Sequence, residues 1–133
     1  MPKSVLIIED ENSIREALIE LFDATDTAVR SAASLPDALH LLSRQAFHLI
    51  VTDIRLGAQA DGGLQVMGAA GLLSPEAVVI ALTAYPDADN RFASQRLGAT
   101  YFLEKPADLL RIASLASRHG VSTALMPGVR DAE

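Results

Sequence analysis

Five side chains that can do chemistry each stand where a short apolar run ends. Glu9 and Asp10 follow the first run, and Asp53 closes the third. Thr83 follows the fourth run, and Lys105 follows the fifth. If these runs are parallel strands of one sheet, their carboxyl ends meet at one edge, near the point where the strand order reverses. We therefore expect three acids, one hydroxyl and one amine to gather there.

Three neighbouring carboxylates need a counter-charge, because two like charges ~4 Å apart repel by about 4 kcal/mol at an effective dielectric of 20. The strand ends offer only oxygen ligands, without His or Cys, which favours Mg²⁺. Lys105 adds a mobile positive charge. A carboxylate such as Asp53 can act as a nucleophile and form an aspartyl-phosphate. Lys105 and the Thr83 hydroxyl can then hold the phosphoryl oxygens that Mg²⁺ neutralises.

Apolar runs alternate with segments of helical periodicity, which predicts parallel strands joined by crossover helices. We expect strands over Val5–Ile8, Thr27–Ala32, Phe47–Thr52, Ala77–Leu82 and Thr100–Glu104. With five intervening helices, this is an α/β fold with a doubly wound, five-stranded parallel sheet. The domain is expected to cover residues 1–120, and residues 121–133, which lack a strong period, are expected to be a tail or linker.

The helices have recognisable starting signals. Ser13 with Glu16 matches a capping box and predicts the first helix start, and Ser34 with Asp37 opens the second. The third is expected to begin near Leu64. The fourth follows Pro86, can be capped by Gly98, and is expected to bury Ala88, Phe92 and Leu97. The fifth carries Leu109, Ile112, Ala113 and Ala116 and stops near His119 and Gly120.

Composition excludes several classes of protein. The 133 residues suit one domain, and half of them are hydrophobic. No apolar run approaches the ~20 residues of a membrane helix. The chain has no cysteine, which fits a reducing cytoplasm. The formal net charge of −6, with scattered basic residues, argues against direct nucleic-acid binding.

Four segments carry a family resemblance. They read VLIIEDE, LIVTDIRL, VVIALTA and GATYFLEKP. Together, in this order and spacing, they resemble the signature segments of response-regulator receiver domains over residues 3 to about 118. The resemblance implies a flavodoxin-like strand order 2-1-3-4-5 and a cytoplasmic phosphorylation switch in two-component or phosphorelay signalling.

By this resemblance Asp53 is the phospho-acceptor. Asp10 is a direct Mg²⁺ ligand, Glu9 contributes through water, and the backbone carbonyl of Arg55 is the third protein ligand. The implied phosphate donor is a histidine kinase or a phosphotransfer protein, and the implied target is a protein or output domain that this sequence does not name. A phosphorylation-dependent dimer is one form in which such a domain acts.

The resemblance also assigns the residues that transmit and time the signal. Thr83 and Lys105 bind the phosphoryl group, and Phe102 is the switch aromatic on the face made by the fourth helix, the fifth strand and the fifth helix. The side chains two positions after the acceptor and two after the threonine, Arg55 and Tyr85, overhang the site and are expected to set the lifetime of the phosphorylated state.

The sequence departs from the family pattern at four places. Glu9 stands where aspartate is commoner, Gly57 where proline is usual, and Ala107 where phenylalanine is common, and the loop to Gly63 is longer than usual. None of these changes removes a reactive group.

Two other functions stay open at this point. A phosphatase of the haloacid-dehalogenase type also uses an aspartate after a strand, but it carries a second aspartate where this chain has Arg55, and no insertion here could cap a substrate. A pseudo-receiver would bind partners without phosphorylation, which the complete acid set together with Thr83 and Lys105 argues against.

Overall fold

A computed structural model describes residues 2–129 and shows one parallel sheet in the order β2-β1-β3-β4-β5. The strands are β1 Lys3–Ile8, β2 Thr27–Ala32, β3 Leu49–Asp53, β4 Val78–Thr83 and β5 Tyr101–Glu104. The helices are α1 Asn12–Leu21, α2 Leu35–Arg44, α3 Gly62–Leu73, α4 Ala88–Arg96 and α5 Leu109–Arg118. The predicted fold class, strand order and number of helices are confirmed, with several boundaries shifted by one or two residues.

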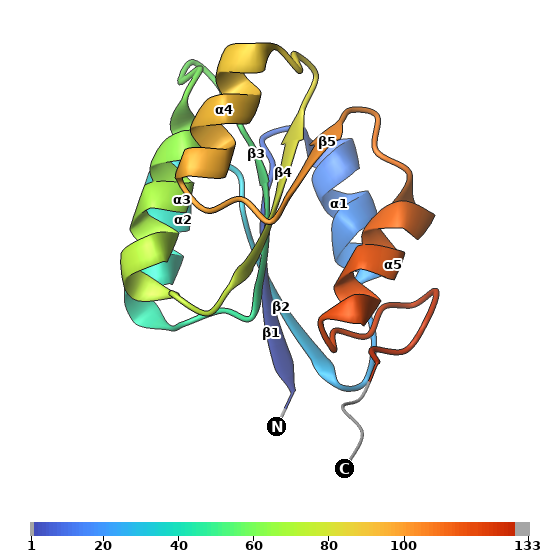
Figure 1. Ribbon diagram of the computed structural model, residues 1–133. Helices are drawn as coiled ribbons and strands as arrows, with labels where there is room; N and C mark the ends of the chain where they lie inside the picture. Colours follow the sequence, from blue (N-terminus) through green and yellow to red (C-terminus); the bar gives the residue numbers. More distant parts are fainter. Residues whose placement is uncertain (1, 130–133) are drawn as a thin grey trace.

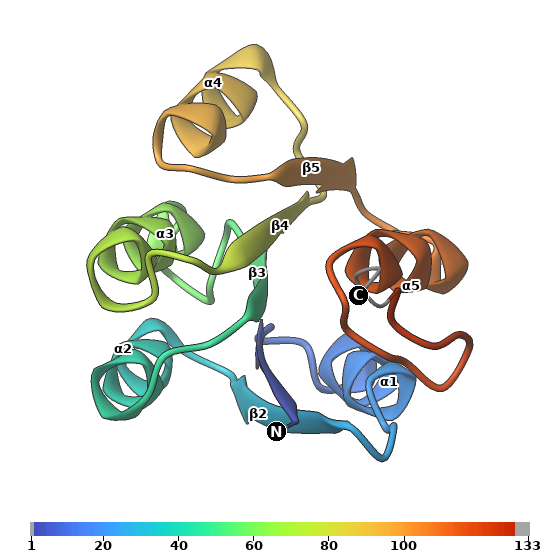
Figure 2. The same cartoon turned by 60° about the horizontal axis from the view of Figure 1, so that its bottom comes forward.

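The sheet separates two layers of helices. Figure 1 and Figure 2 show α1 and α5 on one face and α2, α3 and α4 on the other. Each face has its own apolar core, and the central strands β1 and β3 contribute side chains to both. This explains why β1 is an unbroken apolar run: its last four residues are buried on alternate faces. None of the helices within residues 2–129 is long and apolar enough to cross a membrane.

The start of α1 differs from the prediction. The helix begins at Asn12, and Glu11 occupies the N-cap position without a side-chain capping bond, so the expected capping box of Ser13 and Glu16 is wrong. The helix starts earlier because the Glu11 amide is already bound by the Glu9 carboxylate, which fixes the preceding turn. The second helix starts as predicted, with the amide of Asp37 donating to the Ser34 hydroxyl.

The buried face of α4 also differs from the prediction. Phe92 is 61% exposed and Leu97 is 40% exposed, and Ala88 is exposed as well. Ser94 is the buried residue of this helix. The helix is mainly polar and has no apolar stripe to bury, and Phe92 lies on its exposed side, with the guanidinium carbon of Arg96 5.7 Å from the centre of its ring. The capping prediction for Gly98 is confirmed by its φ of 94° and its amide bond to the Gln95 carbonyl.

Residues 121–129, here called the C-terminal strap, contain no helix or strand but pack against the domain. The strap turns back after α5 and runs beside α1 and the start of β2 (Figure 2). Val121 is buried and Met126 packs on the α1–α5 core. The amide of Ala124 donates to the carbonyl of Leu21 at 2.7 Å. Residues 130–133, the rest of the predicted tail, lie outside the described residues.

Candidate functional site

Three carboxylates meet at the carboxyl edge of the sheet. Glu9 and Asp10 follow β1, Asp53 ends β3, and these two strands are direct neighbours. Carboxylate oxygens of the three residues lie within 4.8 Å of one another. Glu9 and Asp53 are buried, whereas Asp10 is exposed. The predicted gathering of the acids is therefore confirmed.

Lys105 joins two of these acids. Its Nζ donates to Glu9 Oε1 at 2.7 Å and to Asp53 Oδ2 at 2.9 Å. Burial would lower the pKa of Lys105, but its hydrogen bonds to the two carboxylates and their charges raise it above the usual value. Burial raises the pKa of Glu9 above its usual value, and the nearby Asp53 charge adds to this, against the opposing effect of the bonds from Lys105 and the Glu11 amide. These shifts favour the charged form of Lys105, whereas burial disfavours the charged form of Glu9.

The loop after β3 fits closely around Asp53. A Cβ at Gly63 would lie 2.1 Å from the Asp53 carbonyl oxygen, so only glycine fits there. The Gly57 amide donates to Asp10 Oδ2 at 2.9 Å, and Gly57 has a φ of 60°. Proline could neither adopt this φ nor donate this bond. The departure at Gly57 thus ties the β3–α3 loop to the β1–α1 turn.

Thr83, Tyr85 and Arg55 surround the next strand end. The buried Thr83 closes β4, and its hydroxyl accepts a hydrogen bond from the Tyr85 amide at 2.9 Å. The guanidinium carbon of Arg55 lies 5.0 Å from the centre of the Tyr85 ring. This distance allows a cation–π interaction. The two side chains predicted to overhang the site therefore contact one another.

Phe102 and Tyr101 point to opposite faces of β5, as the alternation of a strand predicts. Tyr101 packs against the α1–α5 core, and Phe102 packs on the side of α2 and α3. The guanidinium carbon of Arg91, from α4, lies 4.7 Å from the centre of the half-buried Phe102 ring. Phe102, the predicted switch aromatic, is therefore within cation–π distance of Arg91.

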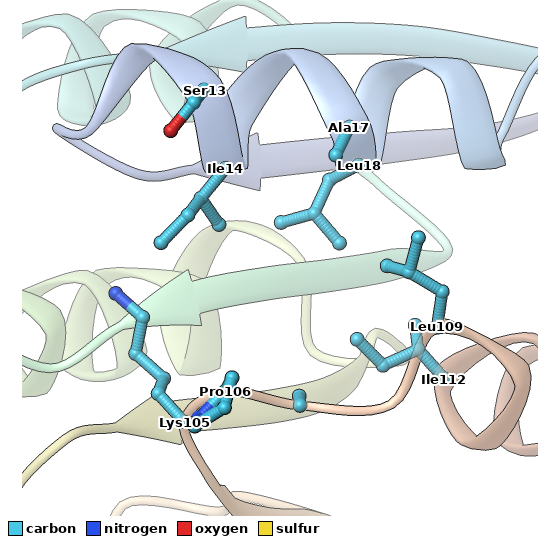
Figure 3. Close-up of a pocket in the computed structure, with 9 residues that line it drawn as sticks. Ser13, Ile14, Ala17, Leu18, Lys105, Pro106, Leu109 and Ile112 are labelled. Atoms are coloured by element: carbon cyan, nitrogen blue, oxygen red, sulfur yellow. The ribbon is translucent and has the colours of Figure 1, made fainter.

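A hollow lies beside Lys105, between α1 and the loop from β5 to α5. Figure 3 shows it framed by Ile14 and Leu18 on one side and by Leu109 and Ile112 on the other, with the lysine side chain at one end. It measures about 230 Å³. The methyl group of Ala107, which stands where the family pattern has phenylalanine, lines this space.

The donors suit a hard divalent cation. Three carboxylates from two adjacent strand ends provide only oxygen ligands, which Mg²⁺ prefers. Like charges held this close, with two of them buried, are costly unless a cation balances them. The partly buried Lys105 balances only part of the charge, because Asp10 makes no ion pair among the described residues.

Sequence reasoning missed two contributors to this site. Arg15 donates from Nη1 to the Glu9 carbonyl at 3.0 Å and from Nη2 to Asn12 Oδ1 at 2.6 Å. The Gly57 amide is the second. The glycine itself was noticeable as a departure from the family pattern, but nothing in the sequence indicates that Arg15 reaches back to the carbonyl of a residue six positions earlier.

The chain is similar to known signalling proteins. The family described as the response regulator receiver domain matches residues 5–117. The response regulator protein PilR of Pseudomonas aeruginosa is 36% identical over 92% of this chain. The response regulator protein FleR of the same species is 30% identical over 96% of this chain. The chain spans about a quarter of the length of these relatives, 26% in each case.

A solved structure extends the similarity. A response regulator protein from Burkholderia pseudomallei superimposes with a TM-score of 0.77 and 31% identity, covering 86% of this chain and 65% of that one. That crystal structure contains a phosphorylated aspartic acid, a calcium ion and citrate.

Proposed function

Because this chain belongs to the response regulator receiver domain family, we propose that Asp53 accepts a phosphoryl group from a histidine kinase or a phosphotransfer protein. The family consists of non-enzymatic phospho-accepting modules, which agrees with the sequence-based prediction and removes the phosphatase alternative. The observation that carries the proposal is the bridge from Lys105 to Asp53 and Glu9 within a group of three carboxylates.

In the proposed transfer, an Asp53 carboxylate oxygen attacks the phosphorus of a partner's phosphohistidine. The phosphorus–nitrogen bond breaks, its electron pair stays on the imidazole, and the imidazole then takes a proton from solvent. Lys105 keeps its proton, because its pKa is raised, and can donate to a phosphoryl oxygen. Mg²⁺ would neutralise charge on the phosphoryl oxygens; the carboxylates of Glu9, Asp10 and Asp53 and the backbone carbonyl of Arg55 would hold it.

Thr83 and Phe102 would pass the change on to the face formed by α4, β5 and α5. The Thr83 hydroxyl now accepts from the Tyr85 amide and would have to turn toward the phosphoryl group. Phe102 would swing into the vacated space and leave the guanidinium of Arg91. This is a two-state packing change that a new charge biases, and the altered face would bind a target protein or output domain.

The proposal is tested by incubating the purified chain with Mg²⁺ and acetyl phosphate and measuring its mass. We expect one stable phosphate adduct in the wild type and none in Asp53→Asn, which keeps the side-chain shape and removes the nucleophile. An Asp53→Asn variant that is phosphorylated at the wild-type rate would show that the acceptor is another residue. A wild-type chain that never gains mass would instead favour a pseudo-receiver.

We also infer that Arg55 and Tyr85 prolong the phosphorylated state. Hydrolysis needs a water in line with the bond from Asp53 to phosphorus, and the contacting pair of side chains would obstruct its approach. Each tenfold change in rate corresponds to about 1.4 kcal/mol, so a modest obstruction suffices. We expect a half-life of minutes or longer, shortened in Arg55→Asn and Tyr85→Ala, measured as phosphate loss in Mg²⁺. A wild-type half-life of seconds, or unchanged rates in both variants, would contradict this.

A further inference from the structure

Asp10 is the one exposed acid of the three, yet its carboxylate is held in place. An exposed aspartate normally samples several rotamers, and fixing it for a ligand costs conformational entropy. Two contacts in the described part of the chain remove much of that freedom, one acting on the backbone around Asp10 and one on its carboxylate.

The backbone contact comes from Arg15 in the first turns of α1. Two nitrogens of its planar guanidinium bind the residues on either side of the Asp10–Glu11 pair, through the Glu9 carbonyl at 3.0 Å and Asn12 Oδ1 at 2.6 Å. Because the guanidinium fork is rigid, these two bonds fix the width of the turn. Arg15 is partly buried, and so is its bond to the Glu9 carbonyl, whereas its bond to Asn12 is exposed.

The side-chain contact comes from the other loop of the site. The Gly57 amide donates to Asp10 Oδ2 at 2.9 Å and leaves Oδ1 without a hydrogen-bond partner among the described residues. A backbone donor that belongs to the β3–α3 loop thus orients an exposed side chain of the β1–α1 turn.

We propose that Arg15 and the Gly57 amide form a cradle that positions Asp10 for the divalent cation. Neither group touches the cation or the phosphoryl group, so both are positioning residues. The inference rests on the proposed function, because it assumes that Asp10 is a metal ligand. Groups that orient metal ligands typically change metal affinity by 10- to 100-fold, so loss of either contact is expected to weaken Mg²⁺ binding about tenfold.

The first arm of the test removes the Arg15 fork. Calorimetric titration with Mg²⁺ compares the wild type with Arg15→Gln, Arg15→Lys and the control Arg44→Gln, which removes a cation from the last turn of α2. We expect about tenfold weaker binding in both Arg15 variants and wild-type affinity in the control. Full affinity in Arg15→Lys would overturn the inference, because charge alone would then explain the effect.

The second arm addresses Gly57. A Cβ at this position meets no atom within 4 Å, and asparagine tolerates a positive φ, so Gly57→Asn should keep the amide bond and the Mg²⁺ affinity. Gly57→Pro removes the donor and cannot adopt the positive φ that aims it at Asp10, so it should weaken binding about tenfold. Equal affinities in Gly57→Pro and Gly57→Asn would contradict the cradle.

A readout without metal separates positioning from general loosening. In chelator-treated protein, hydrogen exchange of the Gly57 amide should be faster in Arg15→Gln than in the wild type, whereas amides of β2 should be unchanged. Equal acceleration at both places would reduce Arg15 to a residue that merely stabilises the fold and would overturn the inference. If the wild type binds Mg²⁺ and all variants match it, the cradle fails and the proposed function stands; if the wild type binds none, the proposed function fails first.

Discussion

At the carboxyl edge of the sheet, three carboxylates lie close together and one lysine pairs with only two of them. At the amino edge, polar groups of the C-terminal strap form hydrogen bonds with the rest of the domain. Glu9 at the first edge is fully buried, and its pKa is raised by that burial. Ser122 in the strap is also buried, but its hydroxyl donates to Asp26 and accepts from the Gly128 amide. The carboxyl edge therefore holds like charges close together, whereas the buried hydroxyl at the amino edge has its hydrogen-bond partners.

The difference indicates that this domain keeps its chemistry and its stability in separate places. Like charges held close together destabilise a fold until a cation or a phosphoryl group balances them. The strap lies at the opposite end, where it joins α1, β2 and α5 through hydrogen bonds such as that from Thr27 Oγ1 to the Ser122 carbonyl at 2.7 Å. A receiver with a strained site can stay folded if the far edge contributes enough stability.

The largest expected effect is the loss of the strap. Ending the chain after Gly120 removes the buried Val121 side chain and the hydrogen bonds to Thr27 and Leu21. Burial of a valine contributes about 1.5–3 kcal/mol and each hydrogen bond about 1 kcal/mol, so we expect unfolding free energy to fall by about 3–5 kcal/mol. Urea unfolding measures it, with a chain ending at Val129 as the control. Equal stability of both chains would show that the domain ends at residue 120, as the sequence predicted.

The next largest effect on stability is expected from removing one charge at the carboxyl edge of the sheet. Asp10→Asn removes one of three like charges, and its side-chain oxygen can still accept from the Gly57 amide. Because Asp10 is exposed, we expect the Asp10→Asn substitution to raise the free energy of unfolding by only about 1 kcal/mol in chelator. In Mg²⁺ at 100 times its Kd the wild type gains about 2.7 kcal/mol, which the variant should lack. The variant should therefore melt at the higher temperature in chelator and the wild type at the higher temperature in Mg²⁺. The same order in both conditions would contradict the idea that repulsion among the three carboxylates destabilises the fold without a cation.

Activation should change the environment of residues 83–110 and leave the C-terminal strap unchanged. Addition of beryllofluoride with Mg²⁺, which mimics the phosphoryl group on Asp53, should shift amide resonances across residues 83–110, because Thr83 and Phe102 move together. Amides of the strap should stay unchanged, since no described hydrogen bond links the strap to β4, α4 or β5. Shifts limited to the neighbours of Asp53, or shifts that reach the strap, would break the comparison of the two edges.

Much of the carboxyl edge could be predicted because topology dictates it. Once the apolar runs are parallel strands, the residues that follow them must meet, and this placed Glu9, Asp53 and Lys105 correctly. The contacts of Arg15 could not be predicted, because they depend on the exact turn between β1 and α1. The sequence pattern mistook Ser13 for a helix cap for the same reason.

The amino edge was less predictable. The strap has no periodicity, and its position comes from bonds between residues far apart in the chain, such as Ala124 and Leu21. The inner face of α4 was misjudged because the helix lacks an apolar stripe, so no pattern in its sequence indicates that Phe92 is exposed. Hydrophobic periodicity predicts where helices and strands lie. The contacts of segments with weak periodicity, such as the strap and α4, can be known only from the folded structure.

The smallest expected effect is a pH dependence at the amino edge. His48 accepts a hydrogen bond from the Ser4 amide at Nδ1, over 3.0 Å. Burial, with a contribution from the charge of Lys3, lowers the pKa of His48 below its usual 6.5. A group with a lowered pKa stabilises the fold above its unfolded pKa, so this stability is present above pH 6.5 and is lost as the pH falls through the lower folded pKa.

The size of this effect is small, because the His48 side chain is exposed and its interactions are screened; we expect a few tenths of a kcal/mol. The raised pKa of Glu9 acts in the opposite sense, since its stabilising contribution is present at low pH and is lost as the pH rises. Urea unfolding of the wild type and of His48→Asn, in chelator at pH 7.5 and pH 5, isolates the histidine because both chains share Glu9. The wild type should lose more stability than the variant on acidification. An identical loss in both chains would show that His48 contributes nothing to the pH dependence of stability.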